Sequence, residues 1–185
     1  MTRLIAGVIV LVGLLFVVVG GVRQSKEKTL SAPLKNMHEI TLKSSAFENG
    51  AIIPARFTCD AENVNPPLEI VGIPAETKTL ALIMHDPDAP VSGGWTHWIK
   101  FNIPPETRSI REGQEPTGIS GKGGRENLVY KGPCPPFGTH RYFFKLYALD
   151  TVLSRKEGIG KDELESAMEG HIVGYGELMG LYSRK

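Results

Sequence analysis

The chain has 185 residues and a formal net charge of +1, with 41% hydrophobic and 22% charged residues. So small a net charge gives no long-range attraction for polyanions, which excludes nonspecific nucleic-acid binding as a function. The two cysteines lack a CxxC pair, so they cannot build a structural zinc site by themselves.

The first predicted element is an apolar segment at residues 4–22 that carries no charged side chain. As a helix with a rise of ~1.5 Å per residue it would span roughly 28 Å, close to the thickness of bilayer hydrocarbon. It also lacks the polar face that a helix buried in a soluble core shows. We therefore predict a single-pass N-terminal membrane anchor of the signal-anchor type at 1–22, with a cleaved signal peptide as the alternative.

A linker and one domain come after the predicted anchor. Residues 23–36 read RQSKEKTLSAPLKN, which is typical of a linker, and residues 37–185 suffice for a single domain. Lysine and arginine lie on both flanks of the apolar segment, so charge does not fix its orientation. A signal anchor exports the polypeptide on its C-terminal side, so we expect an extracytoplasmic domain. There Cys59 and Cys134 could form a disulfide, whereas in the cytosol they would be small buried side chains.

Short β-strands separated by turns dominate the predicted domain, because 21 glycines and 13 prolines interrupt the chain. Composition and alternation predict strands at 38–42, 80–84, 95–103, 142–149 and 177–182. The clearest predicted helix spans 161–170, where Leu164, Ala167 and Met168 share a face. A parallel α/β fold requires a helix between its strands, and the sequence predicts no helix between the central strands. We therefore predict a mainly β fold, an antiparallel β-sandwich with one or two short helices.

Two proline- and glycine-rich segments carry most of the chemically reactive residues. The first, residues 85–98, reads HDPDAPVSGGWTHW, and the second, residues 132–142, reads GPCPPFGTHRY. In each, a stiff loop leads into a strand that carries a histidine near its start, His97 or His140. Such rigid loops predict a pocket that is formed before any ligand binds.

Alternation along these two strands predicts which side chains point the same way. The pairs that should share a side are Trp95 with His97, Thr96 with Trp98, and His140 with Tyr142. Both strands can then present an imidazole beside an aromatic ring on one common face. Two imidazoles that face one cavity would hold an anion, because their ring N–H groups donate to its oxygens.

Other interpretations of these residues stay open. Asp86, Asp88, His97 and His140 could supply a metal site, although they lack the i, i+4 spacing of a helical metal motif. A hydrolase or metal-dependent enzyme could use the cluster of Asp86, His97 and His140, but the chain has no GxSxG elbow. Each histidine could also be an ordinary core or surface residue.

The two segments resemble the phosphatidylethanolamine-binding protein family, and more narrowly its bacterial and archaeal Raf-kinase-inhibitor-like branch. The matching motifs are DPDAP at 86–90, WTHW at 95–98, and GPCPP with GTHRY at 132–142. FTCD at 57–60, NPPL at 65–68 and LYALD at 146–150 fit as well. The resemblance covers residues 38–184 and implies a sandwich of antiparallel sheets with a small anion pocket at one end.

The resemblance also implies which residues form that pocket and what it binds. The implied ligand-binding residues are Asp86, Ala89, Pro90, Trp95, His97, Gly132, Pro135, Pro136, His140 and Tyr142. The implied function is a non-enzymatic binding or regulatory protein without a cofactor, a catalytic residue or a metal. Its implied ligand is phosphate or a phosphoryl headgroup, and its implied protein target is a kinase or a protease restrained by contact.

Overall fold

The computed structural model describes residues 37–184, so the predicted anchor and linker at 1–36 lie outside the described residues. The strands are β1 (His38–Glu39), β2 (Thr41–Lys43), β3 (Leu68–Val71), β4 (Thr79–Asp86), β5 (Trp95–Ile103), β6 (Ser109–Ile110), β7 (Ile119–Ser120), β8 (His140–Leu149) and β9 (Ile172–Tyr182). The helices are α1 (Lys161–Met168) and two short 3-10 turns, η2 (Ala55–Phe57) and η3 (Gly124–Glu126). Within residues 37–184, no helix is both long and apolar enough to cross a bilayer.

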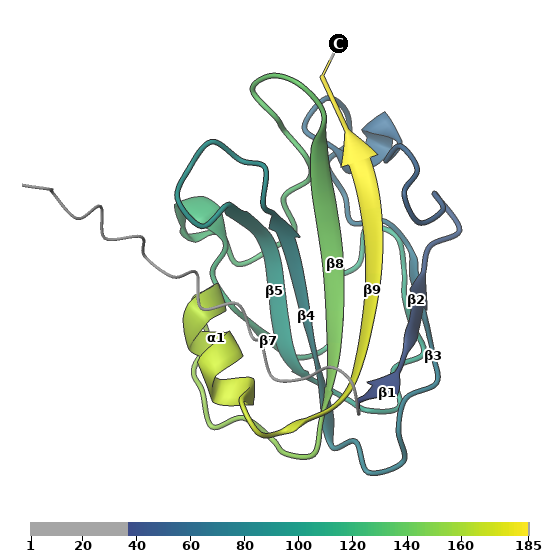
Figure 1. Cartoon of the computed structure of the whole chain (residues 1–185), viewed down its shortest axis with the longest axis vertical. Helices are drawn as coiled ribbons and strands as arrows, with labels where there is room; N and C mark the ends of the chain where they lie inside the picture. Colours follow the sequence, from purple (N-terminus) through teal and green to yellow (C-terminus); the bar gives the residue numbers. More distant parts are fainter. Residues whose placement is uncertain (1–36, 185) are drawn as a thin grey trace, which may run out of the picture.

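Two sheets pack face to face and enclose the main hydrophobic core (Figure 1). The larger sheet has the strand order β1-β9-β8-β4-β5-β7, and the smaller has the order β2-β3-β6. Alternate side chains of both sheets meet between them, including Leu42 and Ile70 from the small sheet and Met84, Trp98 and Phe144 from the large one. The burial of these apolar side chains is the main force that holds the two layers together.

Helix α1 covers part of the opposite face of the large sheet, which we call the outer face (Figure 1). Leu164 and Met168, one turn apart on α1, are fully buried against Ile83, Ile99 and other apolar side chains of that face. The helix therefore seals a second, smaller core. Its short length leaves the end of the outer face near Asp86 without a helix above it.

The sequence predicts the long elements well and the short ones poorly. Strand β5 has the predicted bounds, β8 starts two residues early, and α1 ends at Met168 rather than at residue 170. Strand β9 starts at Ile172 instead of residue 177, and β3, β6 and β7 were not predicted. The predicted sandwich is antiparallel except at one edge, where β1 pairs parallel with β9.

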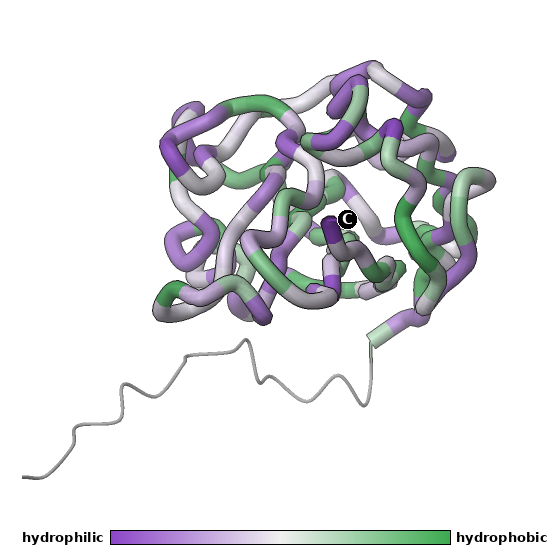
Figure 2. Tube along the Cα trace, turned by 90° about the horizontal axis from the view of Figure 1, so that it is seen from above, coloured by the Kyte–Doolittle hydropathy of each residue, from purple (hydrophilic) through white to green (hydrophobic). Residues whose placement is uncertain are grey.

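Strand β4 lies in the middle of the large sheet, and all of its residues are buried. Its last two residues, His85 and Asp86, point to opposite faces, as successive residues of a strand must. Asp86 pairs with Trp95 at the start of β5, and the neighbouring β8 starts at His140. Residues from three adjacent strands are thus brought together at one end of the sheet, and Figure 2 looks down onto this end.

Candidate functional site

A cavity of about 580 Å³ opens at this end of the large sheet, and we call it the inner cavity. Its walls contain nine of the ten residues that the sequence indicated: Asp86, Ala89, Pro90, Trp95, His97, Gly132, Pro135, Pro136 and His140. These residues come from two loops and the ends of three strands, which are far apart in the sequence. The volume lies within the range of roughly 300–1,000 Å³ that is typical of small-molecule sites.

The most buried polar contact of the inner cavity joins Asp86 to His140. The Nδ1–H of His140 donates to Asp86 Oδ2 at 2.8 Å. Asp86 is 3% exposed and His140 is 4% exposed. The second carboxylate oxygen, Oδ1, accepts the backbone N–H of Asp88 at 2.8 Å. Both oxygens of Asp86 are therefore occupied, and the contact fixes the orientation of the imidazole, with Nε2 as its remaining ring nitrogen.

His97 is held in a similar way by a backbone group. Its Nδ1–H donates to the carbonyl oxygen of Lys131 at 2.7 Å, and only 5% of the residue is exposed. Burial lowers the pKa of His97, and the hydrogen bond to Lys131 opposes this shift only in part. The ring is therefore neutral at pH 7, with its proton on Nδ1 and a lone pair on Nε2.

The orientation of His97 does not follow from simple alternation along the strand. Met84 pairs with Trp98 and His85 pairs with Thr96, so His97 is the extra residue of a β-bulge. Trp98 enters the core between the sheets, whereas Thr96 contacts His85 on the outer face. The prediction that Thr96 and Trp98 share a side was therefore wrong, because the bulge shifts the register by one residue.

Tyr142 takes a different place from the one that the sequence indicated. It is fully buried behind the two imidazoles and is not among the residues that line the inner cavity. Its ring centre lies 5.3 Å from that of His97 and 6.4 Å from that of His140. Its hydroxyl has no hydrogen-bond partner among the described residues, and burial raises the pKa of Tyr142. Its contacts bring the two imidazoles against one common ring.

Asp88 is a structural anchor and lies apart from the inner cavity. Its carboxylate accepts hydrogen bonds from Arg141 Nε at 2.9 Å, Nη2 at 2.7 Å and the backbone N–H at 2.9 Å. These contacts bind the loop after β4 to the start of β8. With Asp88 paired in this way, residues 37–184 contain no cluster of three His, Cys, Asp or Glu side chains that could hold a metal ion.

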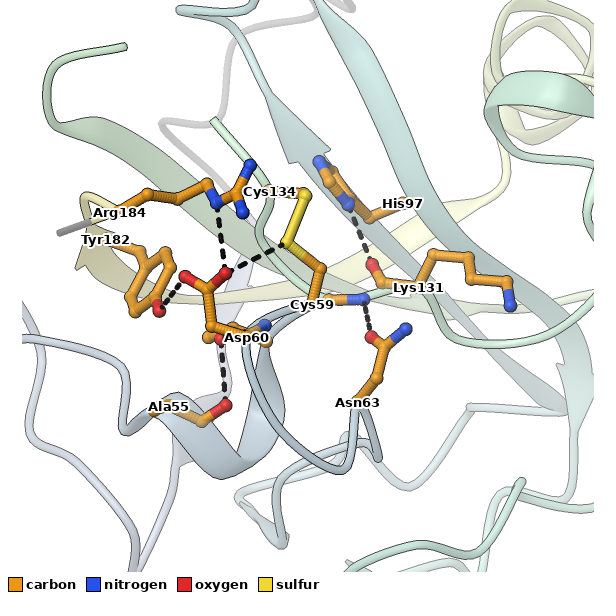
Figure 3. The surroundings of a disulfide bond; sticks show 11 residues. Ala55, Cys59, Asp60, Asn63, His97, Lys131, Cys134, Tyr182 and Arg184 are labelled. Atoms are coloured by element: carbon orange, nitrogen blue, oxygen red, sulfur yellow. Dashed lines mark hydrogen bonds and ion pairs between the residues drawn. A yellow bond between two sulfur atoms is a disulfide. The ribbon is translucent and has the colours of Figure 1, made fainter. Parts of the chain in front are cut away.

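A disulfide joins Cys59 to Cys134 and lies in the wall of the inner cavity (Figure 3). It connects the loop after η2 to the segment that begins at Gly132. On the same side, the side-chain oxygen of Asn63 accepts the backbone N–H of Gly132 at 2.7 Å. A side chain at position 132 would collide with the carbonyl oxygen of Phe57, 2.2 Å from the added Cβ atom. The two loops therefore pack too closely to admit any residue but glycine there.

Several residues of the inner cavity gave no signal in the sequence. Asn63, Arg125, Asn127 and Lys131 line it, and they come from loops that lack a recognisable motif. Arg125 has a left-handed backbone with φ of 55°, which is uncommon for a residue with a side chain. Gly124 beside it packs directly against the Trp95 ring, so this glycine could have been noticed as a point of close approach.

Comparisons with known proteins add independent information about this chain. The family model described as phosphatidylethanolamine-binding protein matches residues 43–183. A protein of the UPF0098 group from Methanothermobacter thermautotrophicus is 51% identical over 151 residues, which cover 78% of this chain and 99% of that protein. A UPF0098 protein from Pyrococcus horikoshii is 49% identical, and the match covers 77% of this chain and 76% of that protein.

Two solved structures have the same fold. A homologue of phosphatidylethanolamine-binding protein from Chlamydia trachomatis has a TM-score of 0.75 and 41% identity, covering 81% of this chain and 99% of that chain. YbcL from E. coli has a TM-score of 0.74 and 26% identity, covering 79% of this chain and 99% of that chain. The match covers almost the whole Chlamydia chain, so the described domain corresponds in extent to a complete solved chain.

Proposed function

This chain belongs to the phosphatidylethanolamine-binding protein family, a family of binding proteins, and from that premise we propose that its inner cavity holds a small anion. The anion is a phosphate or a phosphoryl headgroup, and the protein acts by binding rather than by catalysis. One observation carries the proposal. His97 and His140 line the same cavity, and each has its Nδ1 atom occupied by a fixed acceptor.

The hydrogen bonds decide how the two rings meet a ligand. Because a carbonyl and a carboxylate can only accept, Nδ1 is the donor in both rings and Nε2 is the atom left for the anion. His97 is neutral and accepts a P–OH proton. Asp86 holds the ring of His140 through its Nδ1–H, so that Nε2 of His140 faces the same anion. A phosphate that carries one proton therefore complements His97.

Titration calorimetry with inorganic phosphate tests the proposal on the fragment 37–185. We expect His97→Ala and His140→Ala each to weaken binding by about tenfold or more, because each removes a hydrogen bond to a charged group. His171→Ala is the matched control, since His171 is exposed and pairs with Asp150 away from the cavity. Unchanged binding in both cavity variants would overturn the proposal, and so would turnover of a phosphomonoester, which would favour the hydrolase alternative.

The source of the phosphoryl group is a separate question with its own measurement. Phosphoethanolamine and inorganic phosphate compete for the inner cavity if it recognises the phosphoryl group alone. Vesicles of phosphatidylethanolamine should outcompete both if the ligand is a lipid headgroup, and vesicles of phosphatidylcholine are the matched control. Binding of phosphoethanolamine should weaken from pH 6 to 8, because its phosphate loses a proton with a pKa of ~6.

We extend the proposal to the position of the protein in the cell. The disulfide between Cys59 and Cys134 supports an oxidising compartment, because cytosolic thiols are kept reduced. An apolar segment at 4–22 would then anchor the domain on the extracytoplasmic side, with a kinase or protease as a contact partner. Protease digestion of intact cells is the test: the domain is cleaved if it is exposed outside and survives if it is cytoplasmic.

A further inference from the structure

A second cavity, of about 1080 Å³, opens on the outer face of the large sheet, and we call it the outer cavity. Strands β4, β5 and β8 form its floor, and α1 with the loops at 92–94 and 122–124 forms its walls. It lies where α1 stops covering the sheet. Only Trp95 and Gly124 line both cavities, so they form a wall between the two.

The floor of the outer cavity contains a buried imidazole with a free ring nitrogen. His85 is 7% exposed, and its Nδ1 lies 3.3 Å from the hydroxyl oxygen of Thr96. Its Nε2 has no hydrogen-bond partner among the described residues. This nitrogen is not among the fully buried side-chain atoms that lack a partner, so it is open to the outer cavity, where a ligand group can reach it. At position 94, which has φ of +70°, a Cβ atom would lie 2.7 Å from this Nε2, so glycine keeps the nitrogen accessible.

Positive charge prevails around this imidazole. Lys145 rises from β8 into the cavity, and within residues 37–184 it forms no ion pair. Lys161, the first residue of α1, lies on the other side. Burial lowers the pKa of His85 to about 4, and the charges of Lys161 and Lys145 both add to the shift, against a smaller opposing effect of Asp86. His85 is therefore neutral at pH 7, and it lies near the positive charges of two lysines.

The acidic residues on the α1 wall do not cancel this charge at the floor. Glu165 and Asp162 both contact Lys161, at 3.0 and 3.3 Å, and Glu163 contacts Arg155 at 3.8 Å. Glu169 lies at the opposite end of α1 from Lys161, beyond the last helical residue. The carboxylates of this wall are therefore paired with other cations or lie at the far end of the helix.

Lys145 forms no ion pair within residues 37–184; its ammonium lies 5.8 Å from the centre of the Phe143 ring, and Glu177 is its cross-strand neighbour. On the wall opposite α1, Lys122 is paired with Glu126 at 3.3 Å. Lys161 is paired on α1, as described above. Lys145 lies on the same face of the large sheet as His85, so its ammonium and the imidazole can act on one ligand.

We propose that the outer cavity is a second binding site, and that it takes a small oxyanion, either a carboxylate or a phosphate. In this proposal the Thr96 hydroxyl, 3.3 Å away, is the donor to Nδ1 of His85, which places the proton of the neutral ring on Nε2. This Nε2–H and the Lys145 ammonium are then the two donors for the oxyanion, with the helix start at Lys161 beside them. The site is independent of the inner cavity and of the function proposed for it.

Nitrogen-15 NMR of histidine side chains in the fragment 37–185 tests this site directly. Sodium acetate and inorganic phosphate are titrated separately, with sodium chloride at the same ionic strength as the reference. We expect the ring signals of His85 to report an Nε2–H tautomer and to shift saturably, with a dissociation constant on the order of millimolar. The acetate and phosphate titrations distinguish the two sources of the oxyanion. Signals of His97 and His140 report the inner cavity in the same sample.

Lys145→Gln should weaken binding at His85 by about tenfold, because it replaces a charge-assisted hydrogen bond by a neutral one. Lys156→Gln is the matched control, since Lys156 is exposed and lines neither cavity. Unaltered His97 and His140 signals show that each variant is folded. The proposal is overturned if neither anion shifts His85 beyond the chloride reference, or if Lys145→Gln binds as well as the unmodified fragment.

Discussion

The two cavities contain the same chemical group in opposite states. In the inner cavity, His97 and His140 donate from Nδ1 to an acceptor of the protein and leave Nε2 for the ligand. In the outer cavity, Nδ1 of His85 meets a hydroxyl, and the ring lies between two lysines instead of beside a carboxylate. The partner of Nδ1 therefore decides which ring nitrogen of a buried imidazole carries the proton, which is Nδ1 in the inner cavity and, in our proposal, Nε2 in the outer one.

Strand β4 produces this difference with two consecutive residues. His85 and Asp86 are both buried, but the alternation of the strand sends one to the outer face and the other to the inner cavity. Asp86 places a carboxylate in the inner cavity. Lys145 of β8 and Lys161 of α1 place positive charge in the outer cavity. Each cavity can therefore be altered alone in two experiments, and a third experiment alters both together.

Removing the disulfide should have the largest effect and should act on the inner cavity alone. Cys59→Ser combined with Cys134→Ser opens a loop of 75 residues, for which the chain-entropy model gives a loss of about 4 kcal/mol. Urea unfolding of the fragment 37–185 measures this loss. Phosphate binding at His97 and His140 should weaken, because both cysteines line the inner cavity, whereas acetate binding at His85 should not change.

Chemical reduction supplies the control for this experiment. Dithiothreitol should destabilise the unmodified fragment to the level of the double variant and leave the double variant as it is. A loss below about 1 kcal/mol, or an equal change in the His85 signals, would show that the disulfide does not hold the inner cavity specifically.

The inner cavity could be predicted from the sequence because its residues lie in two dense motifs. Proline and glycine around DPDAP and GPCPP signal rigid loops, and nine of the ten residues that the family resemblance implied line one cavity. The exact role of His97 could not be predicted in this way. A β-bulge depends on the pairing between β4 and β5, which no local pattern along one strand reveals.

The outer cavity could not be predicted, because its residues are scattered over four elements. His85 belongs to the first motif but points away from the rest of it, and Lys145 and Lys161 look like ordinary surface lysines in the sequence. Only the packing of α1 against the large sheet brings them together. The same reason explains why β3, β6 and β7 were missed: strands of two to four residues are stabilised by their partners rather than by local sequence.

Acid should destabilise the fold through the outer cavity. The pKa of His85 is about 4 in the folded chain, against ~6.5 for an unperturbed histidine, so the unfolded chain binds more protons between these values. The contribution of His85 to the free energy of unfolding is therefore fully present above pH ~6.5, falls as the pH drops towards 4, and levels off below pH 4. These two values correspond to about 3 kcal/mol at pH 4, and because solvent in the outer cavity screens the ring we expect a loss of about 2 kcal/mol from this residue. The lowered pKa of His97 acts in the same direction.

Urea unfolding between pH 7 and pH 4 measures this effect. His85→Asn should flatten the pH dependence by about 2 kcal/mol relative to the unmodified fragment. His171→Asn is the control, because this exposed histidine lines neither cavity. If the free energy of unfolding of His85→Asn depends on pH as it does in the unmodified fragment, the outer cavity admits enough water for His85 to titrate as in the unfolded chain.

Weakening the ion pair between Asp88 and Arg141 should have the smallest effect and should act on both cavities. This pair binds residues 86–90 to β8, and Pro87 of that segment lines the outer cavity whereas Ala89 lines the inner one. The side chains of Arg141 and Asp88 are 52% and 28% exposed, so solvent screening limits the loss in Arg141→Gln to about 1 kcal/mol or less. Anion binding at His85 and at His140 should weaken together, by less than about threefold.

The pH dependence gives this last variant its sharpest test. Hydrogen bonds from Arg141 lower the pKa of Asp88 to about 2, so the pair stabilises the fold fully above pH ~4 and loses its effect as the pH falls towards 2. The difference between Arg141→Gln and the unmodified fragment should therefore be constant from pH 7 to 5 and shrink below pH 4. Lys43→Gln, which loses an exposed contact to Glu69 at 3.5 Å, is the matched control and should not affect either cavity, because neither residue lines one. If Arg141→Gln changes binding at only one histidine, the segment 86–90 is not a shared wall, and the two cavities are separated by Trp95 and Gly124 alone.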